Sequence, residues 1–454
     1  MTVDIPSFLS ANPKLKTVEL VLTDPGGVAR GKWAPVSTLE KALGSGVNFP
    51  LSLHGLDVWG NEVAETGLHI ESGDLDGFNL AAPATLTPVP WPNNAAVATD
   101  AETAMVLLHT LTPDRKPFGG CARTVLAAQT QKLAAKDRYP VCAFELEFHL
   151  LPDETREPRL ASNTSQTTND AQYMYGLEPL AEHGPVFEMI RKAADWAHLP
   201  VDTMVKEAGP NQYEVNLLHR NDPLQAADDV ILLKRIVTEA ARAHGLRATF
   251  MAKPFIDQPG NGMHVHTSLL NGEDENMFAD PASGEKRLRH ATAGLLATMR
   301  QMTLVFINTR NGFRRMAEGS YAPTRTNWGE NNRSVALRLP AAPPKARRVE
   351  HRVAGADANP YLVLAAILAG IDEGLDARAE PPPPLVGNAY DPATLNRGER
   401  LPERMASACD ALAESAFAAR ALGEEMVAIL TAIKRAEVAR FEQDISQFEM
   451  STYL

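Results

Sequence analysis

The sequence predicts an α+β fold whose main sheet is largely antiparallel. Segments in which apolar and polar residues alternate, the period of a β-strand, recur between segments with helical spacing. Their order is mixed and lacks the regular strand–helix alternation of a parallel sheet. With 454 residues the chain exceeds what one hydrophobic core usually serves, so we expect two domains of unequal size.

A β-hairpin is predicted near the N-terminus, over residues 17–36. Apolar and polar residues alternate there on both sides of residues 24–27, which form a turn-favouring Asp-Pro-Gly-Gly run. Further strand-like pieces follow, and then a connection rich in proline and glycine at residues 113–120, before a helix-like stretch. We therefore expect a small first domain over residues 15–112 and a larger one over 118–454.

Two helices of the larger part can be placed from their patterns. Apolar residues recur at helical spacing over residues 186–197 and form one core-facing stripe. The second helix has Asp222 as N-cap, Pro223 at its first position and Gly245 after its end. The prolines at 381–384 interrupt the C-terminal helices and are expected to form a stiff surface connection.

Composition argues against several classes of function. The net charge of -12 opposes binding to nucleic acid or to an anionic membrane, because both need clustered Lys and Arg. The N-terminus has no signal-peptide pattern, and no run of apolar residues is long enough to span a membrane. The 3 cysteines are too few and too scattered for a disulfide framework. We expect a cytoplasmic protein whose partners are small molecules.

Three predicted strands each present polar side chains on one face. Because side chains alternate along a strand, residues two apart point the same way. One such strand alone also fits a half-solvated edge of a sheet, but the recurrence on three strands favours a shared site. The side chains are Glu145, Glu147 and His149 on the first strand, His264 and His266 on the second, and Arg348, Glu350 and Arg352 on the third.

Two further glutamates, Glu207 and Glu214, flank the turn-like residues 208–213, and a reversal there would bring both toward these strands. Glutamates gathered in this way repel one another unless cations neutralise them, and oxygen-rich ligands suit Mg2+ or Mn2+ better than zinc. Divalent ions in such a site fit phosphoryl chemistry. Five glutamates, Glu145, Glu147, Glu207, Glu214 and Glu350, could then converge with one histidine of these strands around such cations.

Arginines near these strands supply groups that clamp carboxylate and phosphate oxygens, although each alone also fits a surface charge. Arg333 and Arg338 are an odd number of residues apart, so in a regular strand their side chains would point to opposite faces. We therefore expect Arg333 to precede the strand or a bulge to intervene. The sequence has no P-loop and no GxGxxG motif between a strand and a helix. The glycines of PGNGMHVH, Gly260 among them, are expected to allow close approach of the backbone to a ligand.

Together these motifs resemble the glutamine synthetases. The resemblance covers about residues 15–450, in the order DPGGVARGK, ELEF, EAGPNQYEVN, GNGMHVHTSL, NRSVALRLP and VEHRVAGADANPYL. It implies a small N-terminal β-grasp domain and a larger catalytic domain with a curved sheet. It also implies a homo-oligomer with active sites between subunits, commonly a dodecamer of two stacked hexameric rings.

The resemblance also implies roles for the residues at the matching positions. ATP and glutamate would form γ-glutamyl phosphate, which an amine then attacks, with two or three Mg2+ or Mn2+ ions per site. One metal would be held by Glu147, Glu207 and Glu214, and the other by Glu145, His264 and Glu350. Glutamate would lie near Gly260, Arg315 and Arg352. Nucleotide phosphates would face His266, Ser268, Arg333 and Arg338, and the catalytic set would be Arg315, Arg333, Arg338 and Tyr321.

Two departures from the family pattern concern the amine. Ammonia-using members carry a glutamate just before the Ala-Pro of a flap loop, where this chain has Tyr321 in EGSYAP. They also carry an aspartate in the N-terminal domain, where this chain has Pro50 or Leu51. Without these two carboxylates the chain has no anionic pocket for a small cation such as ammonium. The flap, FPLS and HRVAGADANPYL segments resemble γ-glutamylputrescine synthetases and related polyamine or monoamine ligases, so we expect an organic primary amine as the acceptor.

Two other interpretations stay open at this point. One is an ordinary glutamine synthetase that keeps ammonia by other means. The other is a catalytically silent relative, although such a protein has no physical reason to retain five mutually repelling carboxylates. Tyr390, in a NAYDP segment loosely similar to the adenylylated segment of some relatives, is expected to be a surface-loop tyrosine.

Overall fold

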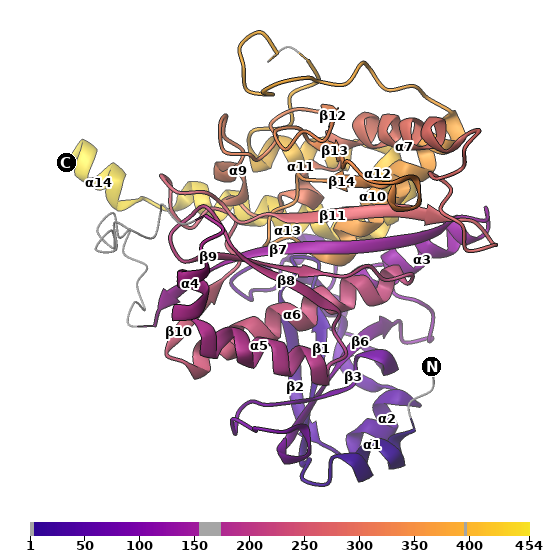
Figure 1. Cartoon of the computed structure of the whole chain (residues 1–454). Helices are drawn as coiled ribbons and strands as arrows, with labels where there is room; N and C mark the ends of the chain where they lie inside the picture. Colours follow the sequence, from indigo (N-terminus) through magenta and orange to yellow (C-terminus); the bar gives the residue numbers. More distant parts are fainter. Residues whose placement is uncertain (1–3, 154–173, 395–396) are drawn as a thin grey trace.

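The computed structural model describes residues 4–153, 174–394 and 397–454. It contains a six-stranded sheet built from the N-terminal strands and an eight-stranded sheet built from the rest of the chain. Figure 1 shows the N-terminal sheet (indigo) at one end of the molecule and the long strands of the larger sheet crossing its middle. The predicted α+β fold class is confirmed.

The first sheet has the order β2-β1-β6-β4-β3, with β5 paired to β6. β1 and β6 are parallel, and the other pairs are antiparallel. β1 and β2 form the predicted hairpin around residues 24–27. Strand bounds are β1 Thr17–Thr23, β2 Ala29–Pro35, β3 Val47–Pro50, β4 Asp76–Ala81, β5 Thr87–Val89 and β6 Thr103–Leu111.

The second sheet has the order β12-β13-β14-β11-β7-β9-β8, with β10 paired to β7. Every pair except β12–β13 is antiparallel, as the sequence predicts. The bounds are β7 Tyr139–Pro152, β8 Val201–Lys206, β9 Gln212–Leu217, β10 Leu246–Thr249, β11 Met263–Leu270, β12 Trp328–Glu330, β13 Leu337–Leu339 and β14 Val349–His351.

Most of the helices pack around the second sheet, and α1 and α2 belong to the N-terminal part. The α-helices are α1 Ile5–Ala11, α2 Thr38–Leu43, α3 Ala122–Ala134, α4 Leu177–Glu182, α5 Gly184–Trp196, α6 Pro223–Ala243, α7 Gly284–Met299, α8 Thr303–Phe306, α9 Gly312–Arg315, α10 Pro360–Ala377, α11 Met405–Ala413, α12 Ala416–Leu422, α13 Glu424–Gln443 and α14 Gln447–Tyr453. Short 3-10 helices span η1 Leu51–Gly55, η2 Ala64–Thr66, η3 Ile70–Ser72, η4 Pro83–Thr85, η5 Ala98–Asp100 and η7 Pro344–Ala346.

The helix α6 lies between the two sheets and has the ends that the sequence predicts (Figure 1). The side chain of Asp222 accepts a hydrogen bond from Leu224 N at 2.9 Å, which satisfies a free backbone donor of the first turn. At the other end, Gly245 takes a left-handed φ of 70°. α6 packs on β7 and also reaches β1, where Arg235 pairs with Glu19 at 3.0 Å.

The alternation along β7 separates the core from the candidate site. Phe144, Leu146 and Phe148 are buried in the largest hydrophobic cluster, against which α3 and α6 pack. Glu145 and Glu147 therefore point to the opposite side of the sheet. Among the described residues, no helix combines the length and the apolar character needed to cross a membrane.

Candidate active site

The register between neighbouring strands brings the predicted polar residues together. Glu145 on β7 lies opposite His264 on β11, and Glu147 lies opposite Glu214 on β9. In an antiparallel pair, directly opposed side chains lie on the same face and within contact distance. The same rule brings β14 into the cluster, because its Glu350 lies opposite His266 on β11 and opposite Arg338 on β13.

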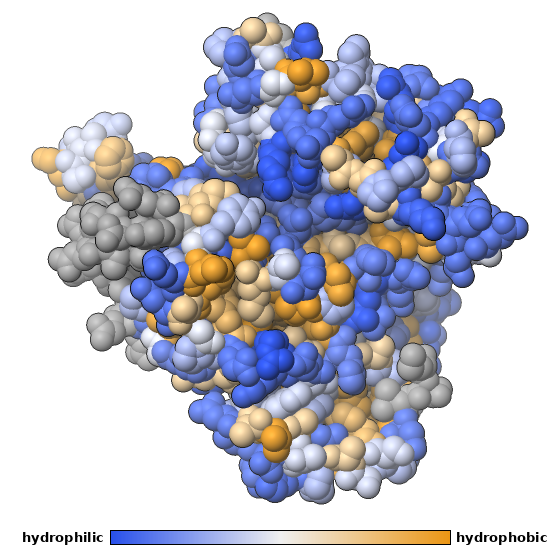
Figure 2. Space-filling view, in the orientation of Figure 1, coloured by the Kyte–Doolittle hydropathy of each residue, from blue (hydrophilic) through white to orange (hydrophobic). Residues whose placement is uncertain are grey.

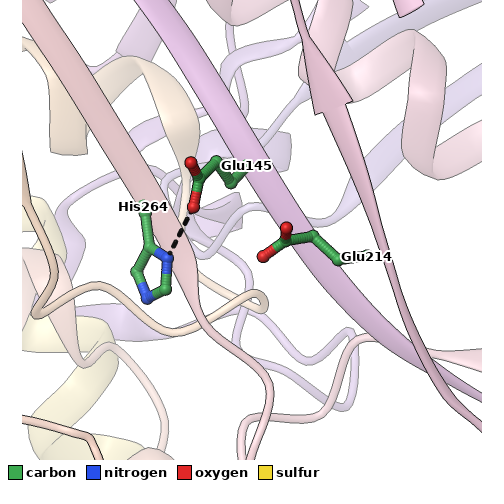
Figure 3. Close-up of side chains that lie close together, drawn as sticks. All are labelled: Glu145, Glu214 and His264. Carbon is green, nitrogen blue, oxygen red and sulfur yellow. Dashed lines mark hydrogen bonds and ion pairs between the residues drawn. The ribbon is translucent and has the colours of Figure 1, made fainter. Parts of the chain in front are cut away.

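Glu145 is the centre of this cluster. Its Oε2 lies 3.0 Å from His264 Nδ1, and its Oε1 lies 2.8 Å from His266 Nε2. Figure 3 shows Glu145, Glu214 and His264 directed toward a common space. One ligand atom from each of these three residues lies within 4.8 Å of the others, and Glu145, His266 and Glu350 form a second such group. His266, expected at the nucleotide phosphates, thus also stands among the candidate metal ligands.

Glu147 and Glu207 border the same cluster. Glu147 Oε2 accepts from Gly262 N at 2.8 Å and from Gln212 Nε2 at 3.3 Å. Glu207 follows the last residue of β8, and its negative neighbours include Glu147 and Glu145. The two groups of ligand atoms within 4.8 Å, found among the described residues, both centre on Glu145 and contain neither Glu147 nor Glu207. Which ion each carboxylate binds therefore stays a prediction.

The electrostatics of the acidic side chains fit a cation site. Burial, followed by the charges of Glu145, Glu147 and Glu207, raises the pKa of Glu214 to about 9. Burial and the charge of Glu147 raise the pKa of Glu207 to about 7. Burial and mutual repulsion favour the protonated form of both carboxyls, although the charge of Lys206 partly opposes this at Glu207. A divalent cation would replace those protons, and the oxygen-rich donor set with one or two histidines suits Mg2+ or Mn2+.

Two arginines hold Glu350 in its charged form. Arg338 Nη1 lies 2.6 Å from Glu350 Oε2, and Arg352 bonds to the other carboxylate oxygen. Burial favours the neutral acid, but the positive charge of Arg352, with those of His266 and His264, lowers the pKa of Glu350 to about 2. Two of the predicted arginines thus lie at the edge of the acidic cluster.

The space beside Gly260 and Gly262 is occupied by protein. A Cβ atom on Gly260 would lie 2.3 Å from Ala252 O and 3.0 Å from Arg315 Cγ, and one on Gly262 would lie 2.7 Å from Arg315 Nη2. Arg315 is buried, and its Nη1 donates to Val353 O at 2.9 Å. The glycines were expected to admit a ligand. Their missing side chains leave room for Arg315 and for the Ala252 carbonyl, so the Arg315 guanidinium lies next to the cluster. Close approach of a ligand to these glycines stays a prediction.

Arg333 and Tyr321 line another hollow, whose Tyr390 lies near Arg315 and Arg352. Arg333 precedes β13, which resolves the parity conflict in the way the sequence suggests. It lines a cavity of about 430 Å³ together with Tyr321, Ser334 and Tyr390. Tyr321 is 66% exposed, whereas Tyr390 lies in a turn outside the helices and strands and is half-buried.

A second cavity, of about 540 Å³, opens directly on the cluster. Glu145, His266 and Ser268 line one side of it, and Lys345 and Arg348 line another. Figure 2 shows hydrophilic side chains gathered in the recess over β7 and β11. A larger cavity of about 760 Å³ lies between α11, α12 and α13, and alanine supplies most of its lining.

Lys345 was missed by sequence reasoning. It lies in η7, in the Pro-Pro-Lys-Ala-Arg-Arg run that leads into β14, and its carbonyl accepts from Asn276 Nδ2 at 3.1 Å. Arg348, noted only as part of a strand face, donates from Nε to His266 Nδ1 at 3.1 Å. A cluster of basic residues immediately before a strand that carries a candidate metal ligand was the available signal.

Comparison with known protein families identifies the arrangement. The family model described as glutamine synthetase, catalytic domain, matches residues 119–453. The chain belongs to the glutamine synthetase family. The resemblance inferred from the motifs is confirmed, and with it a ligase related to the glutamine synthetases, which use ATP and divalent metal ions.

Members of the glutamine synthetase family with several named activities are similar to the whole chain. The γ-glutamylputrescine synthetase PuuA of Escherichia coli K12 is 37% identical over 100% of this chain and 94% of its own. The glutamate–isopropylamine ligase of a Pseudomonas species is 30% identical over 97% and 95%. The glutamine synthetase of Pyrococcus abyssi is 31% identical over 93% and 89%. A solved structure titled "GmaS/ADP complex" matches with a TM-score of 0.85 and 26% identity, over 100% and 99%.

Proposed function

We propose that the protein is an ATP-dependent ligase that joins the γ-carboxylate of glutamate to an organic primary amine. The acceptor class depends on one observation, the exposed aromatic ring of Tyr321 at the position where ammonia-using members carry a glutamate. The same class is supported by similarity to a γ-glutamylputrescine synthetase and to a glutamate–isopropylamine ligase. Putrescine, another polyamine or a monoamine fits this proposal.

The acidic cluster and the cavity beside it account for the first half of the reaction. A γ-carboxylate oxygen of glutamate attacks the γ-phosphorus of ATP, and ADP leaves with the electrons of the broken P–O bond. Lys345 and Arg348 line the cavity and would bind nucleotide phosphates, with His266 and Ser268 beside them. Bound Mg2+ or Mn2+ would neutralise phosphate charge when held by Glu145, Glu147, Glu207, Glu214, His264 and Glu350.

The second half of the reaction forms the amide bond. The neutral amine attacks the acyl carbon of γ-glutamyl phosphate, and phosphate leaves with the C–O bond electrons. Arg338 and Arg352 are oriented by Glu350, so their positive charge is fixed before the reaction begins. Buried Arg315 lies next to Gly260 and would bind the glutamate substrate.

Tyr321 determines which amine is accepted in this proposal. A carboxylate at that position would bind ammonium and help to remove its proton. An aromatic ring attracts a cation more weakly than a carboxylate does, and its apolar face accommodates the alkyl chain of a larger amine. The ring therefore favours alkylamines over ammonium.

A panel of acceptor amines tests the proposal. The protein would receive ATP, glutamate and Mg2+ with ammonium, putrescine, spermidine, ethanolamine, methylamine or isopropylamine, and both phosphate release and γ-glutamylamide formation would be measured. We expect an organic amine to support faster turnover than ammonium. Turnover with ammonium alone would identify an ordinary glutamine synthetase. Absence of glutamate-dependent ATP consumption with every amine would indicate a silent relative.

A further inference from the structure

The loop formed by residues 316–322 follows Arg315 directly, and most of its hydrogen bonds are internal. Ala317 N and the Ser320 hydroxyl both donate to the Arg315 carbonyl, and Ala322 N donates to the Ser320 hydroxyl. With one exception, the hydrogen bonds that this loop makes within the described part of the chain stay between residues 315 and 322. The hydrogen bonds that fix the loop next to Arg315 are therefore almost all local.

The backbone of this loop is strained at Tyr321. Gly319 has a φ of 80°, which glycine adopts freely, but Tyr321 has a φ of 58°, which a bulky residue rarely adopts. Such strain persists only where the surroundings hold it. The Tyr321 side chain is 66% exposed and does not provide that support itself. A neighbouring segment has to supply it.

One hydrogen bond joins the loop to another segment and can supply this support. The Tyr390 hydroxyl donates to the carbonyl of Ala322, the residue after Tyr321, at 3.0 Å. The segment that carries Tyr390 is itself fixed, because Ala389 N donates to the Ser334 hydroxyl at 3.0 Å and the Asn332 amide donates to two carbonyls just upstream. The segment that carries Tyr390 is therefore held in place by hydrogen bonds to Ser334 and Asn332.

The contact lies close to the arginines of the site. Burial raises the pKa of Tyr390 to about 12, against the lowering effect of the nearby guanidinium groups of Arg315 and Arg352. The hydroxyl is therefore protonated at neutral pH and available as a donor. Tyr390 and Tyr321 also line the same cavity of about 430 Å³.

We propose that Tyr390 is a positioning residue, whose hydroxyl holds loop 316–322 over Arg315 and so keeps water from the acyl phosphate. This inference rests on the proposed function, because it assumes that γ-glutamyl phosphate forms. Water reaching the acyl carbon would displace phosphate and regenerate glutamate, so ATP would be consumed without amide formation. Tyr390 touches neither the reacting atoms nor the carboxylate cluster and acts only through the loop.

The first experiment measures loop opening without turnover. Chymotrypsin cleaves after tyrosine, and Tyr321 is exposed within the loop. Cleavage between Tyr321 and Ala322 would be followed by mass spectrometry for the wild type and for Tyr390→Phe, which removes only the hydroxyl. We expect about fivefold faster cleavage in the variant, because the loss of one neutral hydrogen bond, about 1 kcal/mol, raises the population of the open loop by about that factor. Tyr139→Phe is the matched control, because the Tyr139 hydroxyl has no hydrogen bond within the described residues. Equal cleavage of the Tyr390 variant and the wild type would overturn the proposal.

The second experiment measures the coupling of ATP to product. The ratio of phosphate released to γ-glutamylamide formed would be determined with the best amine of the panel. We expect a ratio near one for the wild type and for Tyr139→Phe. For Tyr390→Phe we expect a severalfold higher ratio, with an unchanged KM for ATP and an unchanged thermal midpoint. A merely structural role would lower the stability or the rate but leave the ratio at one, and that result would overturn the proposal.

The two proposals fail in different ways. If the wild type forms no γ-glutamylamide with any amine, the proposed function fails, and the cleavage experiment still decides whether Tyr390 holds the loop. If the wild type forms the amide but Tyr390→Phe keeps both the cleavage rate and the ratio, the proposed function stands and the role of Tyr390 is refuted.

Discussion

Replacement of Glu350 by glutamine is expected to lower both stability and activity. The change keeps the shape of a fully buried side chain that lies between Arg338 and Arg352 and removes only its negative charge. Arg352 is then left buried without its counterion, and the acidic cluster loses one candidate metal ligand. Alanine would also create a cavity, so glutamine is the cleaner test.

The size of the stability loss follows from the pKa of Glu350. A folded-state pKa of about 2, against an ordinary 4.5, corresponds to about 3 kcal/mol of stabilisation of the charged form. Because the folded pKa is lowered, this stabilisation is fully present above pH 4.5 and is lost as the pH falls toward 2. At pH 7 the variant therefore loses the whole contribution. Loss of a preorganised charged group should also lower turnover by about 100-fold or more.

Urea unfolding at pH 7 in the presence of EDTA would measure how much the free energy of unfolding falls in the variant when no metal is bound. Phosphate release with saturating ATP, glutamate and amine would measure turnover. Glu330→Gln is the control, because Glu330 is exposed at the end of β12, in the same sheet. Wild-type turnover in Glu350→Gln would refute the metal assignment. An unchanged urea midpoint would refute the calculated stabilisation.

Three further outcomes are expected. Tyr321→Glu should raise the turnover ratio of ammonium to organic amine at least severalfold, measured in the amine panel; an unchanged ratio would show that Tyr321 does not select the amine. Lys345→Ala should raise the KM for ATP about tenfold with a smaller effect on kcat, as expected for lost phosphate binding; a change in the KM for glutamate alone would contradict this role. Burial lowers the pKa of His54 to about 4, so its neutral form stabilises the fold above pH 6.5, and this contribution is lost as the pH falls toward 4. When the pH is lowered from 7.5 to 5, the free energy of urea unfolding should therefore fall by about 2 kcal/mol less in His54→Gln than in the wild type.

The local elements and the faces of the strands follow from short-range patterns. Phe144 and Glu145 must point to opposite sides of β7 because successive side chains of any strand do so. The N-cap of α6 at Asp222 is equally local, since a side chain and a backbone donor two residues away make the contact. For these features the sequence alone is sufficient.

Strand order and register are decided at long range. Glu145 and His264 are 119 residues apart and meet only because β7 pairs with β11 in one register. A slip of one residue would turn the histidines to the other face. The motifs matched to the family predicted the members of the cluster, but their own spacing does not specify which atoms meet.

The chain by itself determined the fold class, the polar faces of three strands and the family, because these depend on periodicity and on motifs within short segments. Only the tertiary structure decided that Arg315 fills the space beside Gly260, that Lys345 borders the cavity beside Glu145 and that Tyr390 reaches Ala322. Each of these contacts joins segments far apart in the sequence or crosses a turn of irregular backbone. Its geometry is set by how the whole chain packs, not by the local preferences of the residues.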